Sequence, residues 1–306
     1  MNLLSRSLVL VCVLSWTAHS AGQSSIASRL QKQMADTMGT KPGAVVVLDV
    51  ATGKLLAERN IAIAAQRLEA PGSTVKPFIL LELLRLNKVE PAQRLACHRP
   101  LYIGGHRMDC THSPAVASLD ATDAIAYSCN TYFSSMALRM TPSELAETFR
   151  RAGFTSPTGL ASGESIGRIT AAQSQSSLQL QALGDWGIEV TPLELLAAYR
   201  RLALQKQAPN NSSEFAKPVF LGLERSVLYG AAHAAQPLGT SAAGKTGTAS
   251  GVNQPGSHGF FVGYAPADKP EIVLLVYLEH GRGTDAAAVA APLITSYWKL
   301  RHGDAK

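Results

Sequence analysis

The sequence predicts an α+β fold in which a five-stranded antiparallel sheet is flanked by helices and interrupted by a mostly helical inserted lobe. Two strands are predicted early, at residues 43–50 and 54–58. Three more are predicted late, at residues 243–250, 258–265 and 271–278. Consecutive strands joined by short turns pair in the antiparallel sense. Because the early hairpin must complete the same sheet, we expect the chain ends to lie together and residues 78–204, approximately, to form the inserted lobe.

The first elements in chain order are an amphipathic helix and a hairpin. Apolar residues recur at nearly helical spacing between residues 24 and 38, which predicts a helix there. A β-branched run over residues 43–50 then enters the turn at 51–53 and returns over 54–58. This pattern is typical of a hairpin whose first strand is buried.

Several helices are predicted in the middle of the chain and one at its end. Residues 78–86 are apolar nearly all round, which indicates a buried helix. Residues 120–138 are helical in pattern, and residues 286–300 form the last predicted helix. Two further helices begin with a reciprocal capping pair, Thr141 with Glu144 and Thr191 with Glu194.

Composition indicates a globular protein with a substantial core. The 306 residues are 46% hydrophobic and 16% charged, with a net charge of +6. A chain of this length forms one large domain or two small ones. No run of Lys or Arg accompanies the positive charge, so a solvated basic surface is favoured over nucleic-acid binding.

The first 22 residues are typical of a secretory signal peptide. A positive residue, Arg6, precedes an apolar core from residue 8 to 16, and small residues follow at 18–21. The apolar core is shorter than the roughly 20 residues that span a bilayer. We therefore expect cleavage of residues 1–22, an exported periplasmic or extracellular domain over residues 23–306, and no stable membrane span.

The segment from Pro71 to Phe78 contains a candidate nucleophile. Serine needs a base to remove its proton, and Lys76 lies three positions after Ser73. Residues at this spacing share one helix face. Pro77 is tolerated only in a first helical turn, so Ser73 is predicted at or next to a helix start. Alone, Ser-x-x-Lys is also typical of an ordinary amphipathic helix start.

Two later stretches strengthen the prediction. Ser128 and Asn130 provide a second hydroxyl and an amide. A predicted strand edge then carries a cation, two hydroxyls and a glycine that permits close backbone approach: Lys245, Thr246, Gly247 and Thr248. Each triplet is weak evidence by itself, but Ser-x-x-Lys, Ser-x-Asn and Lys-Thr-Gly in this order form the motif set of the penicillin-recognising serine enzymes.

With these motifs in place, nearly the whole mature chain resembles the transpeptidase domain of penicillin-binding proteins, especially the class B enzymes. The resemblance rests on residues 71–78, 128–133, 187–199, 244–249 and 258–266. It implies a β-lactamase/transpeptidase-like fold and a D,D-transpeptidase or carboxypeptidase that acts on D-Ala-D-Ala stem peptides of peptidoglycan and is acylated by β-lactams. The sequence departs from the family at Ser250 and at Asp185–Trp186. No glycosyltransferase or pedestal domain is expected.

The resemblance implies a role for each motif residue. Ser73 attacks the substrate carbonyl, Lys76 removes the serine proton, Ser128 relays a proton to the leaving nitrogen and Asn130 orients the substrate amide. The N–H groups of Ser73 and Thr248 form the oxyanion hole.

The third motif is expected to bind substrate. Lys245 and the hydroxyls of Thr246 and Thr248 hold the substrate carboxylate, and Gly247 allows the close approach. The chemistry needs no metal or organic cofactor.

Two other functions remain open. A β-lactamase would hydrolyse its acyl-enzyme rapidly. The class A type needs a glutamate for this step, and Glu164, the candidate in sequence order, is better explained by a structural role. Asn130 argues against the class D type, which usually has an apolar residue there. The third function is a sensor or scaffold that binds penicillin without turnover.

Three cysteines follow the predicted signal peptide. Export makes a disulfide between Cys97 and Cys110 possible. Nearby His98, His106 and His112 raise a metal site as a competitor, although their spacing fits no zinc template. A disulfide or two buried thiols is favoured. We expect Cys129 to be a small buried residue that points away from the site.

Overall fold

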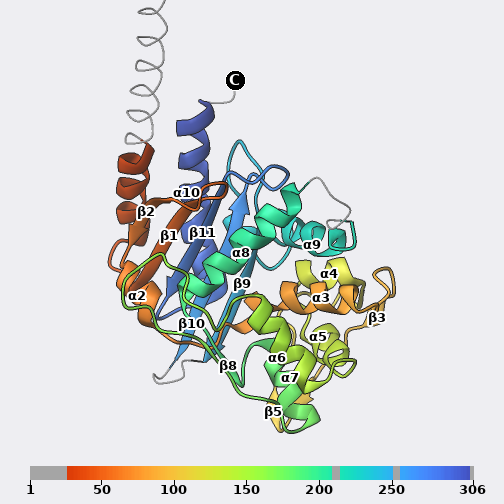
Figure 1. The fold of residues 1–306 in the computed structure, drawn as a ribbon. Coiled ribbons are helices and arrows are strands. Elements are labelled where there is room, and N and C mark those ends of the chain that lie inside the picture. Colours follow the sequence, from red (N-terminus) through yellow and green to blue (C-terminus); the bar gives the residue numbers. More distant parts are fainter. Residues whose placement is uncertain (1–25, 209–213, 251–255, 304–306) are drawn as a thin grey trace, which may run out of the picture.

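The computed structural model describes residues 26–208, 214–250 and 256–303, so the predicted signal peptide lies outside the described residues. Its centre is the predicted five-stranded sheet, in the order β2-β1-β11-β10-β9 with every neighbouring pair antiparallel (Figure 1). The strands are β1 (Gly43–Asp49), β2 (Leu55–Arg59), β9 (Ala243–Ser250), β10 (Ser257–Ala265) and β11 (Ile272–Leu278). The α+β prediction is confirmed, because the late strands follow one another directly while the early hairpin joins them through β1 and β11.

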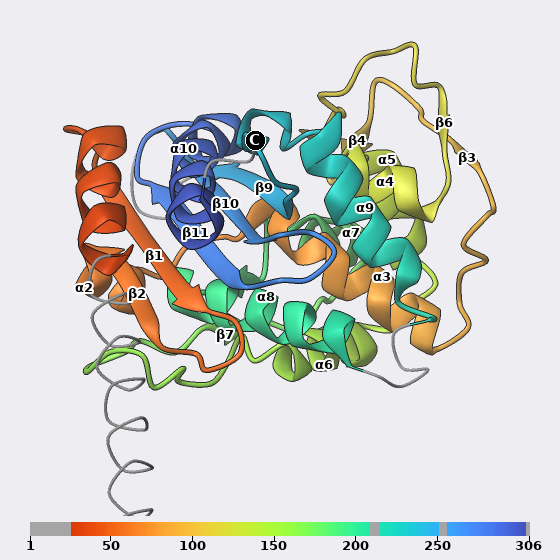
Figure 2. The ribbon, with the colours of Figure 1, turned by 90° about the horizontal axis from the view of Figure 1, so that it is seen from above.

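Helices cover both faces of the sheet. On one face, the helix over residues 26–38 and α10 (Gly283–His302) pack against side chains such as Val45 and Val276. On the other face, α8 (Pro192–Gln207) packs against side chains that include Val46 and Leu275. Figure 2 shows the resulting three layers from above. Alternate residues of β1 therefore enter two different apolar cores, which explains why the whole strand reads as hydrophobic.

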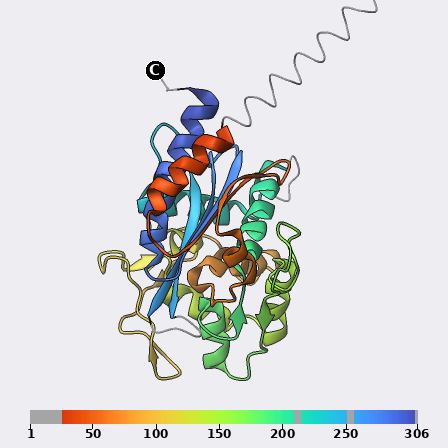
Figure 3. The same cartoon turned by 90° about the vertical axis from the view of Figure 1, so that its left-hand side faces the viewer.

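The two ends of the described chain lie side by side. Ile26 and Arg301 line the same small cavity beside the sheet. Figure 3 shows the N-terminal helix next to α10. This arrangement agrees with the expectation that the early hairpin and the late strands share one sheet.

The segment between β2 and β9 is mainly helical. Its helices are α2 (Ile61–Gln66), α3 (Lys76–Arg85), α4 (Ala121–Ala126), α5 (Asn130–Ala137), α6 (Pro142–Arg151), α7 (Gln175–Leu183), α8 and α9 (Lys217–Leu228). Among its described residues, 3-10 turns are formed by η1 (Gly72–Val75) and η3 (His233–Ala235). Its short strands are β3 (Leu95–Ala96), β4 (Tyr102–Ile103), β5 (His106–Arg107), β6 (Ser118–Leu119), β7 (Arg168–Ile169) and β8 (Ile188–Glu189). Helices α2, α7 and α9 were not predicted from the sequence, and the boundaries of the inserted lobe stay a prediction.

Both predicted capping boxes are present. The Thr141 hydroxyl accepts a hydrogen bond from the Glu144 N–H at 3.2 Å, and Glu144 accepts one from the Thr141 N–H at 2.7 Å. In the second box, the Thr191 hydroxyl accepts a hydrogen bond from the Glu194 N–H at 3.2 Å, and the Glu194 carboxylate accepts one from the Thr191 N–H at 2.8 Å. Each pair satisfies two backbone donors at a helix start, so these residues fix where α6 and α8 begin.

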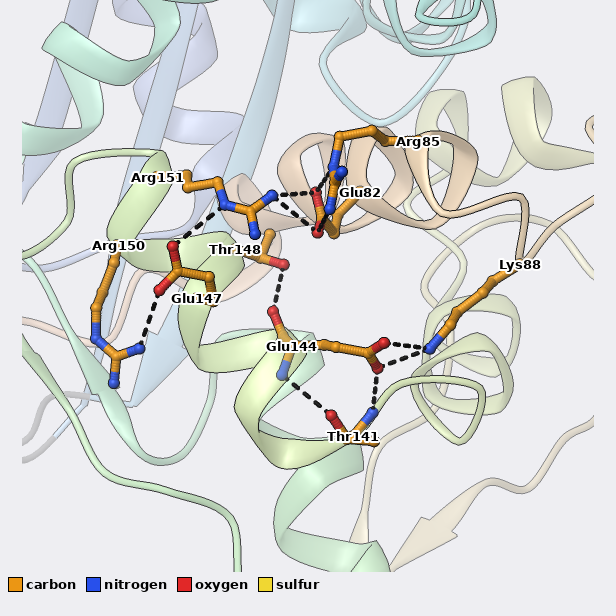
Figure 4. Close-up of polar contacts among 9 residues, drawn as sticks. All are labelled: Glu82, Arg85, Lys88, Thr141, Glu144, Glu147, Thr148, Arg150 and Arg151. Atoms are coloured by element: carbon orange, nitrogen blue, oxygen red, sulfur yellow. Dashed lines mark hydrogen bonds and ion pairs between the residues drawn. The ribbon is translucent and has the colours of Figure 1, made fainter.

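Ion pairs brace α3 against α6, and Figure 4 shows them. The Glu82 carboxylate accepts hydrogen bonds from Arg85 at 2.7 Å and from Arg151 at 3.2 Å. Lys88 donates to Glu144 at 2.6 Å. The Glu82 side chain is only 8% exposed, so its charge is partly desolvated and depends on these partners. The N-terminus of α3 lies at the candidate site, so these contacts at the C-terminal end of α3 help to fix the position of the site.

Across the described ranges, every helix is too short or too polar to cross a bilayer.

Candidate active site

The turn that carries Ser73 lies where the sequence predicts it. Ser73 is half-buried in η1, and α3 begins directly after it with Lys76, placing Pro77 in the first helical turn. The Thr74 hydroxyl donates to the Pro71 carbonyl at 2.8 Å, which closes the turn on itself. Proline is accepted here because the first N–H groups of a helix have no intrahelical partner.

Glycines allow other backbone segments to approach this turn closely. The Gly72 N–H donates to the Gly184 carbonyl at 2.9 Å, and a Cβ at Gly184 would lie 2.1 Å from the Gly72 oxygen. On its other side, a Cβ at Gly72 would lie 3.0 Å from the Thr248 nitrogen. Both glycines have positive φ values, 54° and 75°, which L-residues rarely adopt. The Ser73 turn is therefore held between the 184 loop and β9.

A buried histidine fixes the residues just before the turn. His258 on β10 is 1% exposed, and its Nε2 lies 2.8 Å from the Ala70 carbonyl, to which it donates. The neighbouring Glu69 accepts a hydrogen bond from the Tyr277 hydroxyl at 3.1 Å and pairs with Val190 through its backbone. These contacts tie the entrance of the turn to the central sheet.

Ser128 stands in a tight break between α4 and α5. Its φ of 57° is unusual for a residue other than glycine and ends the helical pattern predicted over residues 120–138. The Ser128 N–H donates to Ile125 O at 3.1 Å, and the Cys129 N–H donates to Ala124 O at 3.0 Å. The break turns the Ser128 hydroxyl toward Lys76 and Lys245.

Two buried lysines approach the Ser128 hydroxyl. The Lys245 Nζ donates to Ser128 Oγ at 2.8 Å, and the Lys76 Nζ lies 3.4 Å from the same oxygen. Lys76 also donates to the Ser128 carbonyl at 2.9 Å and to Asn130 Oδ1 at 2.6 Å. Among the described residues, the Lys76 amine makes its hydrogen bonds to Ser128 and Asn130, and none to Ser73.

Burial lowers the pKa of both lysines. Lys76 and Lys245 are each 0% exposed. Loss of hydration brings the pKa of Lys76 down to about 8, against the weaker opposing effect of nearby cysteines. Burial, and then the positive charge of Lys76, holds the pKa of Lys245 well below its usual value. A Lys76 side chain with this pKa is partly neutral near neutral pH and can accept a proton.

The third predicted motif lies on β9, the edge strand of the sheet. Thr246 is buried and Thr248 is exposed, and both line one cleft with Ser73. The Gly283 N–H donates to the Thr248 hydroxyl at 2.8 Å, which orients that side chain from the start of α10. A Cβ at Gly247 would lie 2.5 Å from Pro71 O, so this glycine lets β9 pack against the Ser73 turn.

A cleft of about 560 Å³ joins these motifs. Ser73, Ser128, Asn130, Thr246 and Thr248 line it, whereas Lys76, Lys245 and Gly247 are buried beside it. All eight sequence-predicted residues are thus brought to one place.

The cleft also has an aromatic and cationic rim that was not predicted from the sequence. The rings of Tyr127 and Tyr229 lie 5.7 Å apart along one side, and Arg282 lines another part of the cleft. Tyr127 precedes Ser128 directly, but Tyr229 and Arg282 sit at the ends of elements with no motif of their own. Tyr229 reaches the cleft through the packing of α9 on α4, and Arg282 reaches it as the N-cap of α10.

Glu164 lies in a loop whose own N–H and hydroxyl groups donate hydrogen bonds to its carboxylate. It accepts hydrogen bonds from the N–H groups of Leu160 and Ala161, each at 2.9 Å, and from the Thr158 hydroxyl at 2.9 Å. Burial opposes ionisation of this carboxylate, but the donors together lower its pKa. Glu164 is not among the residues that line the cleft.

Cys97, Cys110 and Cys129 are free thiols that lie together behind Asn130. The Cys97 and Cys110 sulfurs are 3.5 Å apart, compared with about 2.05 Å in a disulfide. The Asn130 N–H donates to Cys110 Sγ at 3.1 Å. Cys129 is 1% exposed and its sulfur faces the other two, as expected of a residue that points away from the cleft.

Comparison with known proteins identifies the family. The chain is 25% identical over 303 residues to the peptidoglycan D,D-transpeptidase FtsI of Buchnera aphidicola, covering 84% of this chain and 52% of that protein. It is 28% identical over 295 residues to FtsI of Escherichia coli K12, a match that covers 82% of this chain and 49% of that protein. The chain therefore spans about half the length of these curated relatives.

Solved structures share the fold. A Burkholderia ambifaria structure described as a peptidoglycan glycosyltransferase has a TM-score of 0.78 at 23% identity, covering 92% of this chain and 95% of that one. The D,D-transpeptidase domain of a peptidoglycan glycosyltransferase from Eggerthella lenta has a TM-score of 0.77 at 23% identity, covering 90% and 82%. Since the family model for the penicillin-binding protein transpeptidase domain matches residues 43–296, the chain belongs to that family.

Proposed function

We propose that this chain is a serine acyltransferase that acts on D-Ala-D-Ala stem peptides of peptidoglycan, as a D,D-transpeptidase or D,D-carboxypeptidase, and that penicillin acylates it. The observation that carries the proposal is the meeting of three separate motifs at one hydroxyl, where the amines of Lys76 and Lys245 both reach Ser128 Oγ beside the Ser73 turn. The relatives named as D,D-transpeptidases support the substrate class.

Lys76 is the proposed base. A neutral amine has two N–H bonds and one lone pair, and the Ser128 carbonyl and Asn130 Oδ1 accept the two N–H bonds at 2.9 and 2.6 Å. The lone pair is then left to take the proton of a hydroxyl. Because the pKa of Lys76 is about 8, a useful fraction of the amine is neutral near neutral pH.

Acylation proceeds with a balanced exchange of bonds and protons. Ser73 Oγ attacks the carbonyl of the penultimate D-Ala while Lys76 takes the serine proton. As the peptide C–N bond breaks, Ser128 gives its proton to the leaving nitrogen and is reprotonated from Lys76. The products are an ester on Ser73 and free D-Ala. With a β-lactam, the same attack opens the ring and the nitrogen stays attached.

The remaining motif residues bind and polarise the substrate. The N–H groups of Ser73 and Thr248 are the proposed oxyanion donors, each worth about 3–4 kcal/mol to the transition state. Lys245 with the hydroxyls of Thr246 and Thr248 binds the terminal carboxylate, and Asn130 orients the amide. The close packing of Gly72 on the Thr248 backbone supports this arrangement.

The fate of the ester separates the possible activities. Attack by an amine gives transpeptidation, and attack by water gives carboxypeptidation or, with penicillin, β-lactamase activity. The enclosure of Glu164 by four donors of its own loop disfavours its use to activate a deacylating water. We therefore rank the peptidase activities above β-lactamase. We also propose export to the compartment that holds peptidoglycan.

Intact-mass spectrometry after penicillin addition tests the proposal. We expect one stable adduct on the wild-type chain, none on Ser73→Ala, and an unchanged adduct on the control Ser113→Ala, which removes another cleft hydroxyl. Release of D-Ala from a stem peptide then distinguishes an enzyme from a non-turnover binder. Labelling that persists in Ser73→Ala contradicts the serine assignment, and an adduct that vanishes as penicillin is consumed indicates a β-lactamase.

A further inference from the structure

Behind the Ser128–Asn130 break, four side chains with metal-ligand atoms converge. They are Cys97, Cys110 and His112 from the loop-rich segment and Cys129 from the break itself, and their ligand atoms all lie within 4.8 Å of one another. Cys110 and Cys129 are buried, and Cys97 and His112 are half-buried. We infer that these four residues bind one zinc ion, a site that goes beyond the proposed acyl transfer and does not take part in its chemistry.

Four of the six distances between ligand atoms are close to those of a tetrahedral site, and the other two are no longer than 4.8 Å. Zinc–sulfur bonds of about 2.3 Å place two sulfurs about 3.8 Å apart, and a sulfur and an imidazole nitrogen about 3.6 Å apart. The three sulfur pairs are at 3.5, 3.6 and 3.8 Å, and Cys97 Sγ lies 3.5 Å from His112 Nε2. A disulfide would pair only two of the three sulfurs and leave the third cysteine and the histidine unexplained.

Two of the three sulfurs already accept a hydrogen bond from a backbone N–H. The Asn130 N–H donates to Cys110 at 3.1 Å, and the Tyr132 N–H donates to Cys129 at 3.4 Å. The third, Cys97 Sγ, lies 3.7 Å from the Thr131 hydroxyl, which donates its own proton to the His98 carbonyl at 3.0 Å. Such donors stabilise the thiolate form that metals require, and three thiolates with one imidazole select zinc over harder cations. Binding releases the thiol protons to solvent.

The histidine must present its Nε2 lone pair to the metal. This requires the ring proton on Nδ1, where the Ser113 carbonyl accepts it at 3.1 Å. Arg99 Nη2 is 2.8 Å from the same Nδ1 and can only donate, so the guanidinium moves aside when the metal binds.

Zinc at this position would hold the Ser128 break from behind. Cys129 lies between Ser128 and Asn130, and Ser128 has a backbone conformation, φ 57°, that persists only where its surroundings fix it. Asn130 is also held from the same segment, because its amide donates to the Met108 carbonyl at 2.9 Å. The metal therefore joins residues 97–112 to the break and positions Ser128 and Asn130.

Metal content tests the site directly. The purified chain is incubated with Zn²⁺, desalted and measured by inductively coupled plasma mass spectrometry, and Co²⁺ is used in parallel for its thiolate charge-transfer absorption. We expect one zinc per wild-type chain, with most of it lost in Cys97→Ser and His112→Gln. The matched control is His106→Gln, which changes an exposed histidine of the same segment and should keep the zinc.

The outcomes are decisive in each direction. A folded wild-type chain without zinc, equal zinc in Cys97→Ser and His106→Gln, or alkylation mapping that finds a Cys97–Cys110 disulfide would each overturn the site. If Cys97→Ser does not fold, the wild-type cobalt spectrum decides: thiolate-to-cobalt bands support the site and their absence overturns it.

A second measurement tests the positioning role. Chelation of the wild-type chain should slow acylation by a fluorescent penicillin about tenfold or more, and added Zn²⁺ should restore the rate. If acylation is unchanged after zinc removal, the positioning role is overturned, but the measured zinc content still supports the metal site. Absence of acylation in both forms instead contradicts the proposed function, which the zinc count does not depend on.

Discussion

The hydroxyl of Tyr199 on α8 donates a hydrogen bond to the main-chain carbonyl of Thr74, at 2.8 Å, in the turn that carries Ser73. Tyr199 is 0% exposed, so Tyr199→Phe would leave a buried carbonyl unsatisfied. We expect a loss of about 1–3 kcal/mol in the free energy of unfolding, measured by urea denaturation, and slower acylation by penicillin.

Tyr264→Phe is the matched control for that change. Tyr264 is also 0% exposed, but within the described residues its hydroxyl is buried without a hydrogen-bond partner. Removing this hydroxyl should be neutral or slightly stabilising, because the folded state no longer buries an unsatisfied polar group. Equal losses of stability in the two variants would contradict the role assigned to the Tyr199 contact.

The pKa of Lys76 predicts how acylation depends on pH. With a folded pKa of about 8, the neutral amine is a minor form at pH 6 and the major form at pH 9. The acylation rate should therefore rise about tenfold per pH unit below the pKa and level off above it. Stopped-flow measurement with a fluorescent penicillin checks this, and a rate that is flat across the range would rule out Lys76 as the base.

The lowered pKa of Lys76 also makes the stability of the fold depend on pH, and proton linkage fixes the direction of that dependence. The folded pKa lies below the ordinary 10.5, so between about pH 8 and 10.5 the unfolded chain binds the extra proton. The contribution of Lys76 to the free energy of unfolding therefore rises with pH across this window. Lys76→Met should remove that contribution in urea denaturation at pH 8 and pH 10, so that its stability changes less between the two pH values than that of the wild type.

Two glycines with the same backbone conformation provide a fourth prediction. Gly184 has φ +75° and no room for a Cβ, whereas Gly159 has φ +76° and nothing within 4 Å of that position. Both alanine variants pay the strain of a positive φ, but Gly184→Ala also pushes against the Gly72 carbonyl. We expect it to cost about 1–3 kcal/mol more than Gly159→Ala in urea denaturation and to slow acylation. Equal costs would show that the contact between the 184 loop and the Ser73 turn is not tight.

Local chemistry explains the parts of the structure that the sequence predicted. Thr141 and Thr191 begin helices because each has a partner three residues later that completes a capping box. Pro77 locates the Ser73 turn because proline restricts where a helix can start. The late strands are apolar segments bounded by turns, and β9 spans the predicted residues, Ala243–Ser250.

The rest depended on tertiary contacts that no local pattern contains. The Ser128 break is set by packing and by hydrogen bonds to α4, because serine has no intrinsic preference for a positive φ. His112 lies near Cys129 because an irregular loop folds back, and loops have no periodicity to read. Tyr229 reaches the cleft only because α9, which begins without a side-chain cap, packs on α4.

The adjacency of the two ends of the described chain, with Ile26 and Arg301 at one cavity, makes the chain topologically close to a ring. A short linker between them could close that ring, and new ends could be opened at an exposed loop such as that around Gly159, far in sequence from every motif. Circular permutation of this kind would leave the strand order and the register of β9 unchanged. The cleft therefore depends on where the three motifs meet in space, and their order along the chain could change without altering it.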